Sequence, residues 1–324
     1  MPLGSRELLG VVWDPAAQSS TDAVPGDKLR DVGPVLSGLA PLSGHWRQLV
    51  AFAAGYYQRG LGEVALAALP PQLRELSERQ MQRRLGRMTA PATPVDTNAE
   101  AGVPLSAEQQ EVLERLHASQ GSFVLFGTTG SGKTEVYLQC VMQLLRADPR
   151  AQAIVMVPEI NLTPQLQSRF QARFAPLYGE HSVVALHSGM THPQRLRSWL
   201  AAHSGTARVV LGTRMAVFAS VPHLKLIVVD EEHDPSYKQQ EGARYSARDL
   251  AVYRGRLENA RVVLGSATPS LESWHASEPA SSGGPGRYLR LHMPSRIGAG
   301  ALPRVRLVDM SQQPKKTVFS QPLL

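Results

Sequence analysis

Runs of consecutive apolar residues, each about as long as a β-strand, recur through the carboxyl-terminal two thirds of this chain. Segments with helical periodicity or polar loops separate them, and the runs lie at residues 123–126, 153–157, 183–186, 209–211, 226–229 and 261–264. A strand that is apolar at successive positions is typical of a parallel sheet buried on both faces. The pattern therefore predicts an α/β domain with a parallel sheet that helices cover on both faces.

Two further features are expected after the last of these runs. A final pair of strands is predicted near residues 288–291 and 305–308. The preceding segment, residues 271–288, is rich in serine, glycine and proline. Such a composition favours a disordered loop without a function of its own.

The first seventy residues show a different pattern. Short strands are predicted at residues 8–13 and 32–36, and an amphipathic helix that Ser43 would cap is predicted at residues 42–57. A second short helix is expected at residues 61–69, where a pair of prolines follows. A strand pair this small buries little surface by itself. We therefore expect an incomplete, mixed α/β region.

A linker is predicted between this region and the α/β domain. Residues 74–87 are dense in Arg, Gln and Glu, which indicates a solvated helix face, with contact to nucleic acid as the alternative. Residues 89–103 combine small polar residues with proline and glycine, so a domain boundary is expected near residue 100. Ser106 is expected to cap a helix over residues 107–117.

Composition narrows the class of partner. The 324 residues carry a net charge of +7, with a pI near 9.7, which favours an anionic partner such as nucleic acid. Cys140 is the single cysteine, so neither a disulfide nor a cysteine-rich zinc site is expected. No leader and no apolar run of membrane-spanning length is evident in the sequence, and a cytoplasmic location without membrane contact is expected.

The first candidate site is a glycine loop between an apolar strand and a helix start. Gly127 through Thr134 fits the G-x-x-x-x-G-K-[ST] pattern, in which backbone N–H groups and a helix N-terminus hold phosphate groups. Lys133 would reach the β- and γ-phosphates of ATP, and Thr134 would hold Mg²⁺. A glycine turn that binds nothing is the alternative. The predicted ATP-binding residues of the loop are Gly127, Thr128, Thr129, Gly130, Ser131, Gly132, Lys133 and Thr134.

Acidic residues follow a later apolar run. Asp230 and Glu231 open the sequence Asp-Glu-Glu-His, and the carboxyl ends of parallel strands are where open α/β folds bind ligands. Asp230 would orient Mg²⁺, and Glu231 would act as general base toward the attacking water. The alternative is an acidic loop at the end of a strand. His233 more often satisfies a local hydrogen bond than performs chemistry.

Small hydroxyl residues come after the run at 261–264. Ser266 and Thr268 lie in Gly-Ser-Ala-Thr-Pro, where they could bond to the carboxylate pair on one side and to nucleic acid on the other. Following a glycine loop and an acidic pair, this motif indicates a helicase-type motor of superfamily 2. A simple nucleotide kinase becomes the less favoured interpretation.

Together these stretches resemble the PriA family of primosomal replication-restart helicases. The resemblance spans about residues 105–310, is weaker over residues 1–70, and rests on residues 127–137, 157–165, 186–188, 212–214, 230–234, 236–245, 247–251 and 265–270. It implies a P-loop NTPase with a RecA-like sheet. It also implies an ATP-dependent 3′-to-5′ DNA helicase of replication restart and primosome assembly, with a DEAH-like acidic motif.

The resemblance also implies roles for particular residues. Gln109 would read the adenine of ATP. An aromatic-rich loop would sense single-stranded DNA, and other residues would lie near the DNA backbone. These DNA-contacting and coupling residues are Pro164, Thr213, Arg214, Tyr237, Lys238, Gln239, Arg244 and Tyr245, together with Ser266 and Thr268. Forked and single-stranded DNA, other primosome proteins and single-stranded-DNA-binding protein are the implied partners.

The sequence departs from the family pattern at both ends. We expect a partial amino-terminal DNA-binding domain at residues 1–70, a basic helix and linker at 71–104, the first RecA-like lobe at 105–310 and the start of a second lobe at 311–324. The family's zinc-binding cysteines and the rest of its second lobe are absent, so truncation at both ends is expected. Such a fragment would be weak or inactive alone. The alternatives are another superfamily 2 DNA translocase and a DNA-binding module with no turnover.

Overall fold

The structure of the chain is a computed structural model. It describes residues 2–3, 6–7, 10–13, 35–36, 38–88, 103–279, 286–298 and 307–312. The predicted linker at residues 89–103 and the predicted strand at residues 32–36 lie largely outside these ranges.

The centre of the molecule is a seven-stranded sheet in which every pair of neighbouring strands is parallel. Its strand order is β5-β6-β4-β7-β8-β3-β9. The bounds are β3 Ser122–Gly127, β4 Gln152–Met156, β5 Val183–Leu186, β6 Val209–Gly212, β7 Leu224–Asp230, β8 Arg261–Ser266 and β9 Tyr288–Met293. The predicted α/β fold with a parallel sheet is confirmed, because each apolar run forms a strand within one or two residues of its expected position.

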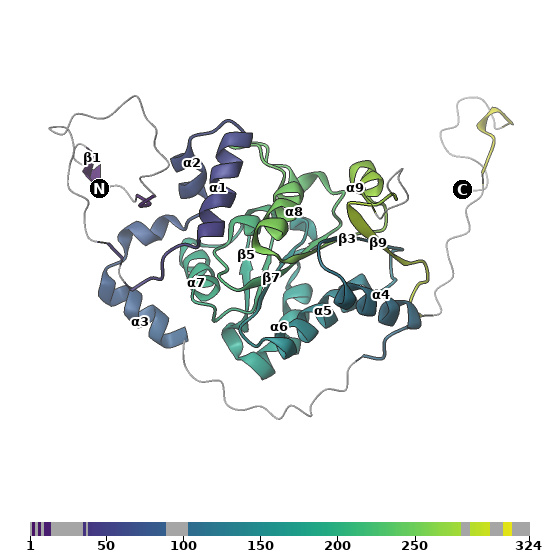
Figure 1. Cartoon of the computed structure of the whole chain (residues 1–324), viewed down its shortest axis with the longest axis horizontal. Helices are drawn as coiled ribbons and strands as arrows, with labels where there is room; N and C mark the ends of the chain where they lie inside the picture. Colours follow the sequence, from purple (N-terminus) through teal and green to yellow (C-terminus); the bar gives the residue numbers. More distant parts are fainter. Residues whose placement is uncertain are drawn as a thin grey trace.

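Helices cover both faces of the sheet (Figure 1). Helices α4 Ala107–Ala118, α5 Lys133–Ala147 and α6 Pro164–Tyr178 pack on one face. Helices α7 His192–His203 and α8 Ala247–Glu258 pack on the other. Successive strand residues alternate between these two cores: Val155 and Val228 belong to the first, and Ile154 and Ile227 to the second. This alternation explains why the strands have no polar face.

The amino-terminal helices share one of these cores with the sheet domain. They are α1 Gly44–Tyr56, α2 Leu61–Ala67 and α3 Glu78–Met88, with the 3₁₀ turn η3 Pro71–Glu75 between the last two. Trp46 is buried, and its indole N–H donates to the carbonyl of Phe218 at 2.8 Å. The ring of Phe52 stacks on Tyr253 of α8 with centroids 3.8 Å apart. Residues 38–88 are therefore packed directly on the face formed by α7 and α8.

Short elements complete the described chain. A small antiparallel pair joins β1 Pro2–Leu3 and β2 Arg6–Glu7. The remaining 3₁₀ turns are η4 Glu159–Asn161, η5 Glu180–Ser182, η6 Arg214–Phe218, η7 Pro235–Tyr237 and η8 Met310–Gln312. Among the described helices, none is long and apolar enough to cross a lipid bilayer.

The two helix caps predicted from the sequence, Ser43 and Ser106, are confirmed. The hydroxyl of Ser43 accepts from the N–H of Trp46 at the start of α1. Ser106 and Gln109 form a reciprocal capping box at the start of α4, so each satisfies a backbone donor that has no partner within the helix.

Three expectations about local structure are wrong. Residues 10–13 are not in a strand, and neither are Leu307 and Val308, the described part of the second predicted carboxyl-terminal strand. Within the segment expected to be a loop, residues 271–276 form helix α9 Leu271–Ala276. Its indole Trp274 lies under the guanidinium of Arg290, 3.5 Å from the ring centroid, and edge-on to Phe126. Contacts with β3 and β9 thus stabilise a helix too short to be stable by itself.

Candidate functional site

The glycine loop lies between the end of β3 and the first turn of α5. Gly132 precedes the helix with φ +81°, and Gly130 has φ +85°, a left-handed conformation that only glycine adopts readily. The ammonium group of Lys133 is folded into the loop, where it donates to the carbonyls of Gly127 at 2.9 Å and Thr128 at 3.5 Å. Lys133 is only 8% exposed, so its charge is held inside the loop.

The loop fits a bound nucleotide phosphate. The hydroxyl of Ser131 is buried without a hydrogen-bond partner, and it lies at the helix N-terminus, where a phosphate oxygen would accept from it. Thr134, the predicted Mg²⁺ residue, is the second residue of α5. The segment after β9 runs along the loop: Thr128 donates to the carbonyl of Met293, and Ile297 donates to that of Gly130. This contact between the segment after β9 and the glycine loop was not predicted from the sequence.

Asp230 at the end of β7 is joined to the phosphate loop by a tyrosine. Strand β8 lies between β7 and β3, so the two motifs are not on neighbouring strands. The hydroxyl of Tyr137, on α5, crosses above Gly265 of β8 and donates to Asp230 Oδ1 at 2.9 Å. A Cβ at position 265 would lie 1.8 Å from that hydroxyl, so this contact requires glycine there.

Burial governs the ionisation of Asp230 and Tyr137. Burial raises the pKa of Asp230 above its usual value, and the neighbouring Glu231 raises it further, whereas the hydrogen bond from Tyr137 and the charge of Lys133 oppose the shift. Burial also raises the pKa of Tyr137 well above its usual value, so the phenol stays protonated and acts as a donor. A divalent cation at Asp230 would favour the ionised carboxylate.

Glu231 has an unusual backbone conformation. Its φ of +45° is left-handed, which is costly for a residue with a side chain and often occurs at functional sites. The expected bond between Ser266 and the carboxylate pair is replaced by one to His233, whose Nδ1 lies 2.7 Å from the Ser266 hydroxyl. The same nitrogen lies 3.7 Å from Glu231 Oε2. Ser266 also accepts from the N–H of Thr268, whose side chain is exposed.

Glu232 is the most buried acid of the Asp-Glu-Glu-His motif, and no role for it was predicted from the sequence. Its carboxylate accepts from the Ser270 N–H at 2.6 Å, the Ser270 hydroxyl at 3.0 Å, the Ser273 hydroxyl at 2.9 Å and the Arg248 guanidinium at 3.3 Å. Arg248 lies on α8, before β8 in the chain, whereas Ser270 and Ser273 lie beyond β8 at the start of α9. Glu232 therefore fixes the acidic motif to the segment that follows the Ser-Ala-Thr motif.

We expect Glu232→Gln to lower the free energy of unfolding by about 2 kcal/mol, because hydrogen bonds to a charged group contribute about 1.5–3 kcal/mol. The side-chain N–H₂ group of the glutamine would also face the N–H and O–H donors from which Glu232 accepts. Chemical denaturation of the purified chain measures this change. Glu272→Gln is the matched control, since Glu272 is 3.9 Å from the same arginine but its side chain is 76% exposed. Equal stability of the two variants would contradict this role.

The predicted DNA-sensing loop, at residues 237–246, is hydrogen-bonded directly to the acidic motif. Tyr237 is 2% exposed, and its hydroxyl donates to the backbone carbonyl of Asp230 at 2.6 Å. Arg214 donates to the side chain of Gln239 at 2.6 Å and to the carbonyl of Ser236 at 3.2 Å. The structure thus brings together three residues of the predicted DNA group and connects them to Asp230.

The same loop also contacts Tyr57, the residue that follows the last turn of helix α1. The ammonium of Lys238 lies 5.3 Å from the centroid of the Tyr57 ring, and the Tyr57 hydroxyl accepts from the N–H of Ser246 at 3.0 Å. Tyr245 packs edge-on against Phe218, and burial raises its pKa to about 12. Among the predicted DNA-sensing residues Tyr237, Lys238, Gln239, Arg244 and Tyr245, only Lys238 and Arg244 are exposed. Contact between the loop and α1 was not foreseen from the sequence.

The remaining predicted residues are more scattered. Pro164 is exposed at the first position of α6, at the carboxyl edge of the sheet, whereas Thr213 is only 4% exposed. Gln109 is 1% exposed and donates to the carbonyl of Gly132 at 3.2 Å. Its contact with adenine stays a prediction, as do the DNA contacts of Pro164 and Thr213.

Tyr137 is a functional residue that the sequence could have revealed. It follows Lys133 by four residues, so both project from one side of α5. No comparable signal exists for Glu232 or Tyr57, whose partners are distant in the sequence. Within the described residues, no group of three or more His, Cys, Asp or Glu side chains is placed to hold a metal ion. The donors at hand, Thr134 and Asp230, suit Mg²⁺, which takes few protein ligands beside phosphate oxygens.

Two family profiles match this chain. The profile of the DEAD/DEAH box helicases matches residues 106–276, and that of a 3′DNA-binding domain matches residues 1–70. The first match runs from α4 to α9, covers every strand of the parallel sheet except β9, and includes the glycine loop and the acidic motif.

Individual proteins of known sequence or structure also resemble this chain. The replication restart protein PriA of Haemophilus influenzae is 33% identical over 394 residues, which cover 100% of this chain and 52% of the relative. PriA of Bacillus subtilis is 38% identical over 230 residues, covering 68% of this chain and 27% of the relative. A solved structure of RecG bound to a three-way DNA junction aligns with 79% of this chain and 30% of its own, at 15% identity and a TM-score of 0.45. The chain spans about half the length of the Haemophilus relative.

Proposed function

Because this chain belongs to the DEAD/DEAH box helicase family and is a relative of the replication restart protein PriA, we propose that it is the first ATP-binding lobe of a 3′-to-5′ DNA helicase of replication restart, preceded by a DNA-binding segment. The observation that carries the proposal is the contact between Tyr137 and Asp230, which joins the phosphate loop to the acidic motif across Gly265. Forked and single-stranded DNA would be the substrates, and other primosome proteins and single-stranded-DNA-binding protein the partners.

The residues of the site have distinct tasks in this proposal. Bound Mg·ATP supplies the phosphoanhydride bond whose hydrolysis drives the motor. Lys133 and the loop N–H groups would hold its phosphates, while Thr134 and Asp230 would hold the metal ion. Glu231 would take a proton from the attacking water, and Tyr137 would keep Asp230 oriented. Gln109, fixed against Gly132, would contact the base.

Coupling to DNA would pass through the loop that follows the acidic motif. Tyr237 is hydrogen-bonded to the backbone of Asp230, and Arg214 is hydrogen-bonded to Gln239. A DNA strand that displaces Arg214 or Lys238 would therefore shift the loop that positions Asp230. Aromatic and arginine side chains suit single strands of any sequence. Ser266, held by His233, would relay movement to Thr268 and the segment beyond it.

The test is ATP binding and turnover by the 324-residue chain, with and without single-stranded DNA. We expect weak binding of Mg·ATP and slow turnover, because a second lobe supplies positive charge to the transition state in this family, an effect of about 10³–10⁵ in rate. Absence of any nucleotide binding would refute the proposal. Rapid turnover stimulated by DNA would contradict the expected slow rate.

Two other functions are tested by the same measurements. A different superfamily 2 translocase would bind ATP equally well but show no preference for DNA with a free 3′ end. The match to the 3′DNA-binding profile favours such a preference for this chain. A DNA-binding module without turnover would bind DNA with an affinity that ATP does not change.

A further inference from the structure

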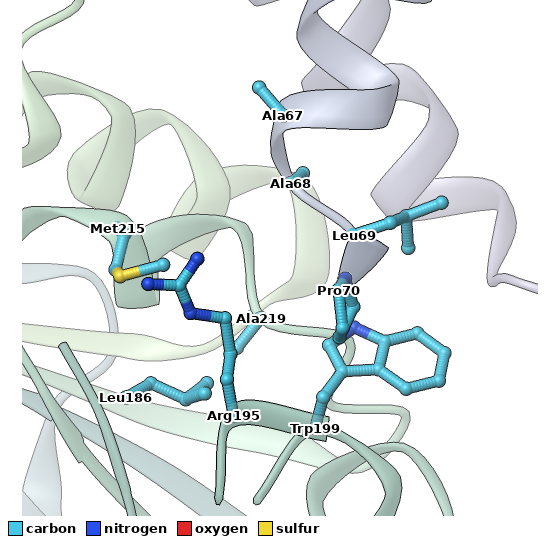
Figure 2. Close-up of a pocket in the computed structure, with 9 residues that line it drawn as sticks. All are labelled: Ala67, Ala68, Leu69, Pro70, Leu186, Arg195, Trp199, Met215 and Ala219. Atoms are coloured by element: carbon cyan, nitrogen blue, oxygen red, sulfur yellow. The ribbon is translucent and has the colours of Figure 1, made fainter. Parts of the chain in front are cut away.

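A small pocket lies where the amino-terminal segment meets the sheet domain, at the edge of the sheet far from the phosphate loop (Figure 2). Residues 67–70, at the end of α2, form one wall. The other wall comes from the sheet domain and consists of Leu186, Arg195, Trp199, Met215 and Ala219. The pocket has a volume of about 20 Å³. It is distinct from the ATP site and from the loop at residues 237–246.

Two residues in the lining of this pocket carry hydrogen-bond donors without a partner. Arg195 Nε and Trp199 Nε1 are both buried, and neither has a hydrogen-bond partner. Trp199 is 3% exposed as a whole. The two residues are four apart on α7, so they project from the same side of the helix, as Figure 2 shows. Buried donors are nearly always paired, so two in one small pocket indicate an acceptor that binds between them.

The chemistry of the lining selects the acceptor. Every other side chain around the pocket is that of Ala, Leu, Pro or Met, which offers neither a charge nor a competing donor. A guanidinium group beside a second N–H favours an anionic oxygen, and arginine is suited to phosphate. The volume is enough for about one water-sized atom, so a single phosphate oxygen, and no nucleobase, would enter the pocket.

The position of the pocket points to DNA as the source of the phosphate. Leu186 is the last residue of β5, and Met215 follows Arg214 just after β6, so the pocket lies at the carboxyl ends of these strands, beside the proposed DNA contact Arg214. Arg195 also donates to the carbonyl of Ser188, just beyond β5, at 3.4 Å. The facing wall belongs to residues 1–70, which match the 3′DNA-binding profile.

We propose that this pocket binds one phosphate group of a DNA strand that passes from the amino-terminal segment onto the lobe. The proposal rests on the proposed function for the presence of DNA. It adds Arg195 and Trp199 as a phosphate-binding pair at the junction.

The test is the affinity of the full 324-residue chain for a labelled single strand with a free 3′ end, measured over a range of salt concentrations. We expect Arg195→Gln to weaken binding about tenfold and to reduce the slope of log affinity against log salt by about 0.7, the value for one phosphate contact on a single strand. Trp199→Phe, which keeps an aromatic ring but removes the donor, should weaken binding about threefold. The control is Arg197→Gln, which removes the same charge from an exposed position on α7.

A second arm replaces DNA with inorganic phosphate. Thermal unfolding is followed with phosphate against chloride at equal ionic strength, which also checks that each variant is folded. Stabilisation of the unmodified chain but not of Arg195→Gln, with DNA affinity unchanged, would assign the pocket to free phosphate. If neither DNA affinity nor phosphate stabilisation differs between Arg195→Gln and Arg197→Gln, the pocket holds water and the proposal is wrong. Failure of the unmodified chain to bind DNA would refute the proposed function, while the phosphate arm would still test the pocket.

Discussion

Lys133→Ala is expected to weaken Mg·ATP binding by at least about 100-fold while the chain stays folded. The ammonium group lies inside the glycine loop, 2.9 Å from the carbonyl of Gly127. Its charge is almost completely shielded from water, so it would act on a phosphate in a medium of lower dielectric, where charge-assisted hydrogen bonds are stronger. Alanine keeps the helix start but removes both the charge and the donor.

Equilibrium titration with a fluorescent ATP analogue measures this loss. The matched control is Lys225→Ala, because Lys225 is an exposed lysine on β7 and its removal changes the net charge equally. Thermal unfolding of both variants separates loss of the site from loss of the fold. Unchanged affinity in Lys133→Ala would mean that the glycine loop does not bind the phosphates, and the proposed function would then be wrong.

Glu231→Gln is expected to reduce ATP turnover by about 100-fold or more and to leave ATP binding nearly intact. Glutamine has the same size but cannot take a proton, and a positioned general base contributes about 10²–10⁴ in rate. The left-handed backbone at this position is an unfavourable conformation that both residues share, so the substitution adds no new strain.

Single-turnover hydrolysis with excess protein measures this rate even where the chain is slow. Glu114→Gln, at an exposed position on α4, is the control for removal of one carboxylate. A combined loss of binding and turnover would place Glu231 in nucleotide or metal binding instead. Full turnover in the variant would exclude it as the base.

Local signals in the sequence predicted much of the fold. The run at residues 183–186 coincides with β5, and the helices expected to begin after Ser43 and Ser106 do so. These predictions depend on interactions within a few residues: consecutive apolar side chains need burial on both faces, and a capping hydroxyl meets an N–H three residues ahead. The glycine loop is equally local, because its conformation requires glycine at particular positions.

Other features depend on contacts that no local signal encodes. Helix α9 was expected to be part of a loop, since its six residues lie in a polar stretch, and Arg290 and Phe126 decide its structure by packing on Trp274. The contact of α1 with the loop at residues 237–246 joins Tyr57 to Ser246, 189 residues apart. The cost of bringing such distant residues together is met by the whole core and not by either segment.

The sequence by itself determined the strands, the capped helices, the phosphate loop and the identity of the acidic pair, because each follows from residue type and spacing over a short stretch. Only the tertiary structure decided that β8 separates the two motifs and that Tyr137 reaches Asp230 across Gly265. It also decided that Glu232 holds the segment beyond β8, and that Arg195 and Trp199 share a pocket with the end of α2. The physical reason is that the packing of the two cores sets the order of the strands and the side-chain contacts across the sheet. The same apolar pattern along the chain is compatible with many different strand orders.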